Sequence, residues 1–156
     1  MALAGGLFAQ TDTIQPPYKR FPTYPPLKLT LHDGTTYTKD NLPKKKAVML
    51  MLFNPSCDHC QHETETMVQN MDKFKNVQIV MVTTAPNAEL LAFREKYHLD
   101  QFSNVVMGRD NDYFLFSFFS IHNFPFHAFY NKKKELISVF EGSMTLDKIT
   151  KELEKD

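Results

Sequence analysis

The chain has 156 residues, of which 42% are hydrophobic, a size and composition typical of one globular domain rather than of a disordered segment. Basic and acidic residues both number 18, so the formal net charge is zero, and charge gives no indication of nucleic acid or an anionic membrane as a partner. No apolar run in the sequence is long enough to span a bilayer.

Residues 1–26 are predicted to form an extended N-terminal segment before a domain at 27–156. Proline fixes φ and lacks a backbone donor, and this segment contains five prolines. The first ten residues, "MALAGGLFAQ", resemble the end of a secretory signal around its cleavage site, although a basic n-region and a longer apolar core are missing. We therefore expect a truncated export signal, and the alternative is the tail of a cytosolic protein.

Residues 27–38 predict a β-hairpin. Leu27, Leu29 and Leu31 alternate with polar residues, which is the two-residue period of a half-buried strand. Asp33-Gly34 is a hairpin turn signal, and residues 35–38 form the returning strand.

Two continuous apolar runs, residues 47–53 and 77–84, predict central strands that are covered on both faces. Asn54-Pro55 ends the first run, and Ser56 is positioned to cap a helix that begins at Cys57. The apolar face of this helix is predicted from a spacing of three and four residues, at Cys60, Thr64, Met67, Met71 and Phe74.

The rest of the chain continues to alternate strands and helices, which implies an α/β fold with a largely parallel sheet between helical layers. The lysine runs 44–46 and 132–134 are interpreted as solvated loop charges, and the turn at 131–134 must join antiparallel strands. The expected elements are a helix from Asn87, a strand at 104–108, a helix at 112–120, a strand from Pro125, a strand at 135–142 and a helix capped by Thr145.

The two cysteines of the chain, Cys57 and Cys60, form a Cys-x-x-Cys pair directly after a buried strand, which indicates redox chemistry. At the start of a helix, Cys57 faces free backbone N–H groups and the positive end of the helix dipole, and both stabilise a thiolate. Cys60, one turn further on, is expected to be buried and to resolve a mixed disulfide by attacking Cys57.

The two residues between the cysteines tune this balance. A protonated His59 stabilises the Cys57 thiolate, whereas the negative charge of Asp58 opposes it. The alternative is that His59 has no role.

A zinc site is the second interpretation of the cysteine pair. Such a site normally takes four Cys or His ligands, so it would need scattered histidines in addition to this pair. Two inert core cysteines are the third alternative.

On these residues, the chain resembles the thioredoxin superfamily over residues 27–155, and more narrowly the TlpA/ResA-like (AhpC/TSA-related) thiol-disulfide oxidoreductases. The resemblance rests on "MLFNPSCDHC", on "NFPFHAFY", on an extra helix and strand at about 87–107, and on the leading hairpin. It implies a thioredoxin-like three-layer fold with a central mixed sheet, an N-terminal β-hairpin and an inserted αβ unit. Thioredoxins usually have Trp before the first cysteine, where this chain has Ser56.

The resemblance also implies further site residues. Pro125 would be cis and would lie beside the cysteine pair, and Phe124 would present its backbone to the substrate. Glu63, three residues after Cys60, matches a glutamate that TlpA/ResA-like proteins often carry. It lies on the same side of the helix as Cys60, and a partly buried carboxylate there would accept the proton of Cys60. An ordinary exposed glutamate is the alternative.

His127 follows Pro125 by two residues and is expected either in the core or in the cleft. Phe124 and Phe126 are the expected exceptions to a purely structural role of the phenylalanines at 114–129.

The sequence thus predicts a protein thiol-disulfide oxidoreductase, a monomer, with no cofactor beyond a redox-active Cys57–Cys60 disulfide and no metal. Expected partners are a cysteine-containing substrate protein and, by the resemblance, a membrane-bound thiol electron donor or acceptor, with the protein periplasmic or otherwise extracytoplasmic. The direction of electron flow stays open. The alternatives are a peroxiredoxin-like peroxidase, which would have Thr or Ser where this chain has Asn54, and a non-catalytic metal-binding or docking module.

Overall fold

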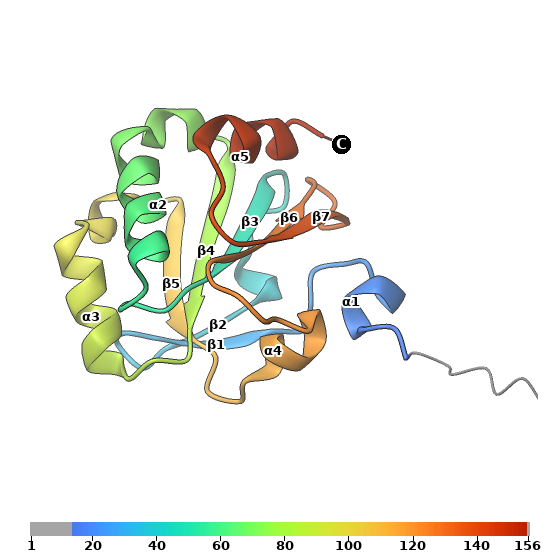
Figure 1. Cartoon of the computed structure of the whole chain (residues 1–156), viewed down its shortest axis with the longest axis horizontal. Helices are drawn as coiled ribbons and strands as arrows, with labels where there is room; N and C mark the ends of the chain where they lie inside the picture. Colours follow the sequence, from blue (N-terminus) through green and yellow to red (C-terminus); the bar gives the residue numbers. More distant parts are fainter. Residues whose placement is uncertain (1–13, 156) are drawn as a thin grey trace, which may run out of the picture.

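One seven-stranded sheet organises the computed structural model, which describes residues 14–155 (Figure 1). Its strand order is β2-β1-β5-β4-β3-β6-β7. The strands are β1 (Lys28–Leu31), β2 (Thr36–Thr38), β3 (Ala47–Leu52), β4 (Val77–Thr83), β5 (Val105–Arg109), β6 (Phe126–Tyr130) and β7 (Leu136–Glu141). The predicted hairpin, central strands and thioredoxin-like architecture are confirmed.

The sheet is mixed rather than largely parallel. Only the β3–β4 and β4–β5 pairings are parallel, and the other four are antiparallel. The prediction from alternating elements overestimated the parallel part because each end of the sheet is completed by an antiparallel hairpin, β1–β2 at one edge and β6–β7 at the other.

Helices cover both faces of the sheet. In Figure 1, α2, α3 and α5 lie on one side of the strands, and α1 and α4 lie on the other. The α-helices are α1 (Pro17–Arg20), α2 (Asp58–Gln69), α3 (Asn87–Lys96), α4 (Phe114–Phe119) and α5 (Leu146–Leu153), and single 3₁₀ turns occupy Lys39–Asn41, Met71–Phe74 and Leu99–Gln101. In the part of the chain that the structure describes, no helix is both long and apolar enough to cross a membrane.

Alternating residues of β3 and β4 divide the interior into two cores. Met49 and Met51 pack with α2, α3 and α5, whereas Val48 and Leu50 pack with α4 and the N-terminal segment. Every residue of both strands is buried, which explains why their sequences are continuous apolar runs rather than alternating ones.

The start of the cysteine helix differs from the prediction. Helix α2 begins at Asp58, and its N-cap is Cys57 rather than Ser56. Ser56 instead donates from its backbone N–H and its hydroxyl to the side-chain oxygen of Asn54, at 3.0 and 2.8 Å. The apolar face continues past the end of α2, because Phe74 lies in the following 3₁₀ turn.

The N-terminal segment is not simply extended. Residues Pro17–Arg20 form one helical turn with proline at the first helical position, where the missing N–H costs nothing. Tyr18 packs against Phe119, and Tyr24 is buried against Tyr130. The expected export signal lies outside the described residues, and the division at residue 27 stays a prediction.

The third lysine of the 132–134 run is not a solvated loop charge. Lys134 adopts a left-handed backbone conformation with φ of 66° and directs its ammonium group to three backbone carbonyls. Its Nζ donates to Pro43 and Lys46 at 2.8 Å and to Lys132 at 3.2 Å. Lys134 therefore ties the loop before β3 to the turn after β6.

Candidate active site

Cys57 lies at the end of the chain segment that leaves β3, and its side chain closes the first turn of α2. The Sγ atom accepts a hydrogen bond from the backbone N–H of Cys60 at 3.3 Å, so a sulfur atom occupies the place that a Ser or Asp oxygen usually takes. The residue is partly exposed and is a free thiol in this structure. This position combines access from solvent with a backbone N–H donor directed at the sulfur.

Cys60 lies one turn further along α2 and is fully buried in the core. Burial raises the pKa of the Cys60 thiol, and the interactions with the Cys57 side chain and the charge of Glu63 raise it further. A thiol in this environment needs a base to become a nucleophile.

The Phe124–Pro125 peptide bond is cis, as predicted. Leu52 pairs directly with Phe126, so Pro125, at the start of β6, lies at the same end of the sheet as the end of β3, from which the chain leads to Cys57. Pro125 is buried, and its carbonyl accepts the N–H of Gly142 at 2.8 Å, whereas Phe124 is partly exposed.

Glu63 is buried, with 4% of its surface exposed, so the alternative of an exposed helix glutamate is wrong. One carboxylate oxygen, Oε2, accepts the backbone N–H of Met144 at 3.0 Å. The other, Oε1, contacts Nε2 of His127. The carboxylate is therefore held by two polar partners from parts of the chain far from α2.

His127 is a candidate functional residue for which the sequence predicted only a position in the core or in the cleft. Its side chain is fully buried, and its Nδ1 atom lies 3.2 Å from the carbonyl oxygen of Phe140. On the paired strands it stands opposite Met51 and faces the α2 side of the sheet. The only sequence signal for the contact with Glu63 was that His127 and Pro125 share one side of the strand.

Asp58 and His59, the two residues between the cysteines, are both exposed in the first turn of α2. Asp58 is the acidic residue of that turn, where the helix dipole favours it. Within residues 14–155, no three or more His, Cys, Asp or Glu side chains are grouped as ligands for a metal ion.

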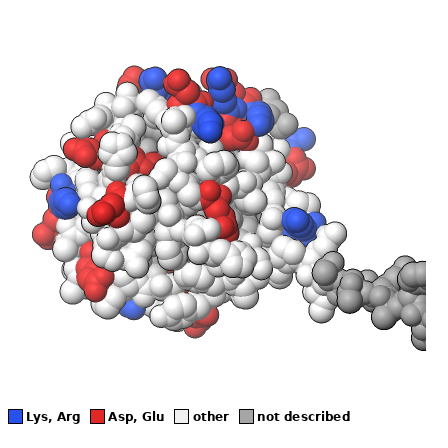
Figure 2. All heavy atoms as spheres, viewed as in Figure 1, with Lys and Arg blue, Asp and Glu red and all other residues white. Residues whose placement is uncertain are grey.

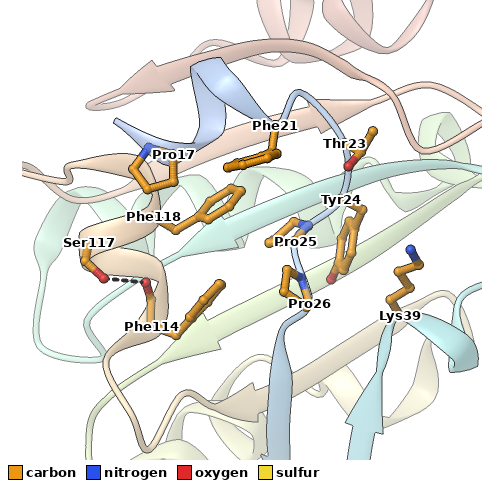
Figure 3. Close-up of a pocket in the computed structure, with 10 residues that line it drawn as sticks. All are labelled: Pro17, Phe21, Thr23, Tyr24, Pro25, Pro26, Lys39, Phe114, Ser117 and Phe118. Atoms are coloured by element: carbon orange, nitrogen blue, oxygen red, sulfur yellow. Dashed lines mark hydrogen bonds between the residues drawn. The ribbon is translucent and has the colours of Figure 1, made fainter. Parts of the chain in front are cut away.

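A hollow of about 280 Å³ adjoins the cysteine motif on the side of α3. Pro55 and Ser56, directly before Cys57, form one wall, and Phe93 and Lys96 of α3 are part of the other. A second hollow, of about 470 Å³, lies between α4 and the N-terminal segment and is shown in Figure 3. Its walls include Phe118 and Tyr24 but none of the cysteine or cis-proline residues.

Charges of both signs are mixed on the face shown in Figure 2. Lysine, arginine and acidic side chains gather together at the upper edge, over α5, and the area below carries scattered charged groups, mostly acidic, between uncharged regions.

A buried strand that leads into a helix capped by the first cysteine of a Cys-x-x-Cys pair, with a cis-proline at the same end of the sheet, is characteristic of the thioredoxin-like class of proteins. The AhpC/TSA family model matches residues 22–146, and the chain belongs to the AhpC/TSA family. The resemblance to TlpA/ResA-like proteins is thereby confirmed. No match was found among curated protein sequences.

Solved structures share this fold at low sequence identity. A secreted disulfide oxidoreductase of Mycobacterium tuberculosis, homologous to DsbE of E. coli, superposes with a TM-score of 0.69 at 20% identity, covering 82% of this chain and 94% of that one. An exposed lipoprotein thioredoxin of Streptococcus pneumoniae gives 0.64 at 21% identity, with coverage of 81% and 96%. A peroxiredoxin-like protein of Aquifex aeolicus gives 0.66 at 13% identity, with coverage of 84% and 83%.

Proposed function

We propose that the protein is a thiol-disulfide oxidoreductase that uses Cys57 and Cys60 to reduce or oxidise cysteines of partner proteins. The observation that carries the proposal is the asymmetry of the pair. Cys57 is accessible and accepts an N–H bond at a helix start, whereas Cys60 is fully buried behind it. An attacking thiolate and a protected resolving thiol need these two environments.

In the reductive direction, the Cys57 thiolate attacks one sulfur of the partner's disulfide. A bond forms between Cys57 and that sulfur, the partner's S–S bond breaks, and the released partner sulfur takes up a proton. Cys60 then loses its proton and attacks Cys57 Sγ, which forms the Cys57–Cys60 disulfide and releases the second partner thiolate. Two electrons pass from the cysteine pair to the partner, and the redox-active disulfide is the only cofactor required.

Glu63 is the proposed acceptor of the Cys60 proton. Because burial raises the pKa of Cys60, the neutral thiol dominates at neutral pH and must transfer its proton to a nearby base. The Glu63 carboxylate lies on the same buried face of α2 and contributes to that raised pKa.

Four further residues have proposed roles. Phe124 and Pro125 are proposed to shape the groove for the partner. Asp58 and His59 are proposed to tune the reduction potential of the cysteine pair.

A trapping experiment tests the proposal. Cys60→Ser is expected to accumulate a mixed disulfide with a partner or an aromatic disulfide reagent, whereas Cys57→Ser forms none and loses all exchange. Mass spectrometry of the non-reduced protein detects the adduct. Equal trapping by both variants would contradict the assigned roles.

A pH profile tests Glu63. Glu63→Gln is expected to slow the attack of Cys60 on the mixed disulfide by roughly 100-fold at neutral pH, because general bases typically contribute at least that much. The rate of the variant should rise with pH, since only hydroxide then produces the thiolate of a thiol whose pKa is raised. An unchanged profile, measured by stopped-flow, would remove Glu63 from the mechanism.

The direction of electron flow depends on the reduction potential. Potentials of such pairs run from about −270 mV to about −120 mV, and titration against a glutathione buffer measures the value. A reduction potential near −270 mV would contradict the oxidase alternative.

We propose that a membrane-bound thiol donor or acceptor recycles the protein outside the cytoplasm. The secreted and exposed proteins that share the fold support this location.

A peroxiredoxin-like peroxidase is the second candidate, because the chain belongs to the AhpC/TSA family and shares its fold with a peroxiredoxin-like protein. The position three residues before Cys57 is Asn54, whose side-chain oxygen is already engaged by Ser56. Consumption of peroxide without an added protein disulfide would favour the peroxidase.

The third candidate is a non-catalytic metal-binding module. Stoichiometric zinc or copper on the reduced protein, together with no reduction of insulin, would favour it.

A further inference from the structure

Glu63 and His127 form a buried polar pair behind the cysteines. The exposed fractions of their side chains are 3% and 0%. Each partner has one further hydrogen bond, Glu63 to the N–H of Met144 at 3.0 Å and His127 to the carbonyl oxygen of Phe140 at 3.2 Å. All polar atoms of the two side chains are thus engaged inside the core.

The partner of Nδ1 determines the protonation of the imidazole. A carbonyl oxygen only accepts hydrogen bonds, so Nδ1 of His127 must carry a hydrogen that it donates to Phe140. One further proton lies between Nε2 and Oε1 of Glu63, either on an imidazolium facing a carboxylate or on a carboxyl facing a neutral imidazole. Both forms have zero net charge, and a site with little polarity tolerates this.

We propose that His127 is the positioning residue of Glu63, and that it carries the positive charge that balances the Cys60 thiolate when Glu63 takes the proton of Cys60. The inference rests on the proposed thiol-disulfide exchange. Before the transfer, the pair is neutral and Cys60 is a thiol. After it, the proton of Cys60 resides on the pair, so that Glu63 is a carboxyl, His127 is an imidazolium and Cys60 is a thiolate. Protons are conserved and the total buried charge stays zero.

The surroundings leave this charge-balancing role to His127. From α2, the titratable group that faces the pair is Cys60, and β3 contributes the apolar Met51 opposite His127. On β6, the ring of Phe129 is parallel to the imidazole at a centroid distance of 6.1 Å. Lys148 of α5 lies 6.0 Å from the centroid of the Phe140 ring, which lies against the imidazole. Its ammonium group therefore faces a ring and not the carboxylate.

The critical variant is His127→Gln, whose amide N–H can still reach Glu63 but cannot gain a proton. Formation of the mixed disulfide by Cys57 should keep the wild-type rate. Attack by Cys60 should be slowed roughly tenfold at neutral pH, and the rate should rise more steeply with pH. The matched control is His62→Gln on the exposed face of α2, which should leave both rates unchanged. In Glu63→Gln/His127→Gln, the attack by Cys60 should be no slower than in Glu63→Gln alone, because His127 acts through Glu63.

Nitrogen-15 NMR of the imidazole in the wild type gives a readout that does not depend on activity or on the folding of a variant. Nδ1 should be protonated over the whole pH range in which the protein is folded. A bare Nδ1, or wild-type resolution in a folded His127→Gln, would overturn the inference. If the wild type itself forms no mixed disulfide, the proposed function fails instead, and the two failures are thereby distinguished.

Discussion

The two cores on opposite faces of the sheet are built differently. The core under α2, α3 and α5 is rich in methionine and encloses the Glu63–His127 pair and Cys60. The core under α4 and the N-terminal segment is rich in aromatic residues, which include Tyr24, Phe118, Phe119, Phe126 and Tyr130. Methionine has three rotatable bonds and adapts to irregular space, whereas aromatic rings pack with specific geometry.

We relate this difference in composition to the different roles of the two faces of the sheet. In the proposed redox cycle, the distance between the sulfurs of Cys57 and Cys60 would change next to the α2-side core, and a methionine-rich core would accommodate such a change readily. The α4-side core has no comparable change to absorb, and its interlocked rings fix the start of β6 and with it the cis-proline segment. The predictions below test this comparison, from the largest expected effect to the smallest.

Phe119→Ala should destabilise the protein most, by about 3–5 kcal/mol, because it removes a buried ring that packs against Phe118 and Phe126. Urea unfolding measures the loss. The folded fraction should keep the wild-type pH profile of exchange, since the rings that Phe119 contacts belong to Tyr18, Phe118 and Phe126 and not to the cysteines or the Glu63–His127 pair. The control is Phe21→Ala, whose ring is 57% exposed, and for which we expect less than about 1 kcal/mol. Equal losses in the two variants would contradict a tightly packed α4-side core.

The second prediction concerns replacement of the buried Glu63–His127 pair of the α2-side core by apolar side chains. His127→Phe alone should cost about 3 kcal/mol, because it leaves the Glu63 carboxylate buried without its partner. Glu63→Met/His127→Phe should recover most of that loss, since an apolar pair of similar volume often replaces a buried polar pair without cost. The double variant should nevertheless resolve mixed disulfides slowly. A double variant as unstable as the sum of its single variants would show that the pair is needed for folding itself.

Gly108→Ala should cost about 2 kcal/mol by overpacking the join between the leading hairpin and the sheet. A Cβ atom on this β5 residue would lie 2.9 Å from Cβ of Leu29 and 3.3 Å from the carbonyl oxygen of Thr30. Leu29 belongs to the α4-side core, so thermal unfolding should report the loss while exchange stays normal. A loss below about 0.5 kcal/mol would mean that β1 moves away freely.

The smallest effect is expected outside both cores. Lys134→Ala should lower the free energy of unfolding by about 1 kcal/mol, because three backbone carbonyls lose a charged donor that solvent partly replaces. Lys133→Ala in the same turn is the matched control, since its side chain is exposed, and no measurable change is expected. Chemical denaturation of both variants decides whether Lys134 holds the two loops together.

Hydrophobic periodicity and sequence motifs predicted several elements of the fold. The alternation at 27–31 located the hairpin, and the apolar runs located the two central strands. The cis bond at Pro125 was predicted from the resemblance of "NFPFHAFY" to the cis-proline segment of the thioredoxin superfamily. The hairpin and the central strands depend on residues close together in the chain, which is why a single sequence reveals them.

The remaining features depend on contacts between distant segments. His127 meets Glu63 across 64 positions, and only the register of β6 on β3 brings them together. The turn of helix at Pro17 is too short to form alone and is packed through Tyr18 against α4. Cys57 replaced Ser56 as the cap because the side chain of Ser56 turns back to Asn54.

The hydrogen bond from Met144 to Glu63 makes one backbone amide an internal indicator of the site. Its proton faces a carboxylate when Glu63 is ionised and a weaker acceptor when Glu63 is protonated. The amide resonance of Met144 should therefore move as Glu63 changes its protonation, while the amide of Lys148, which points to the side chain of Thr145, should not. A series of two-dimensional amide spectra of the wild-type protein can thus follow the proton during the proposed redox cycle, without a probe attached to either sulfur.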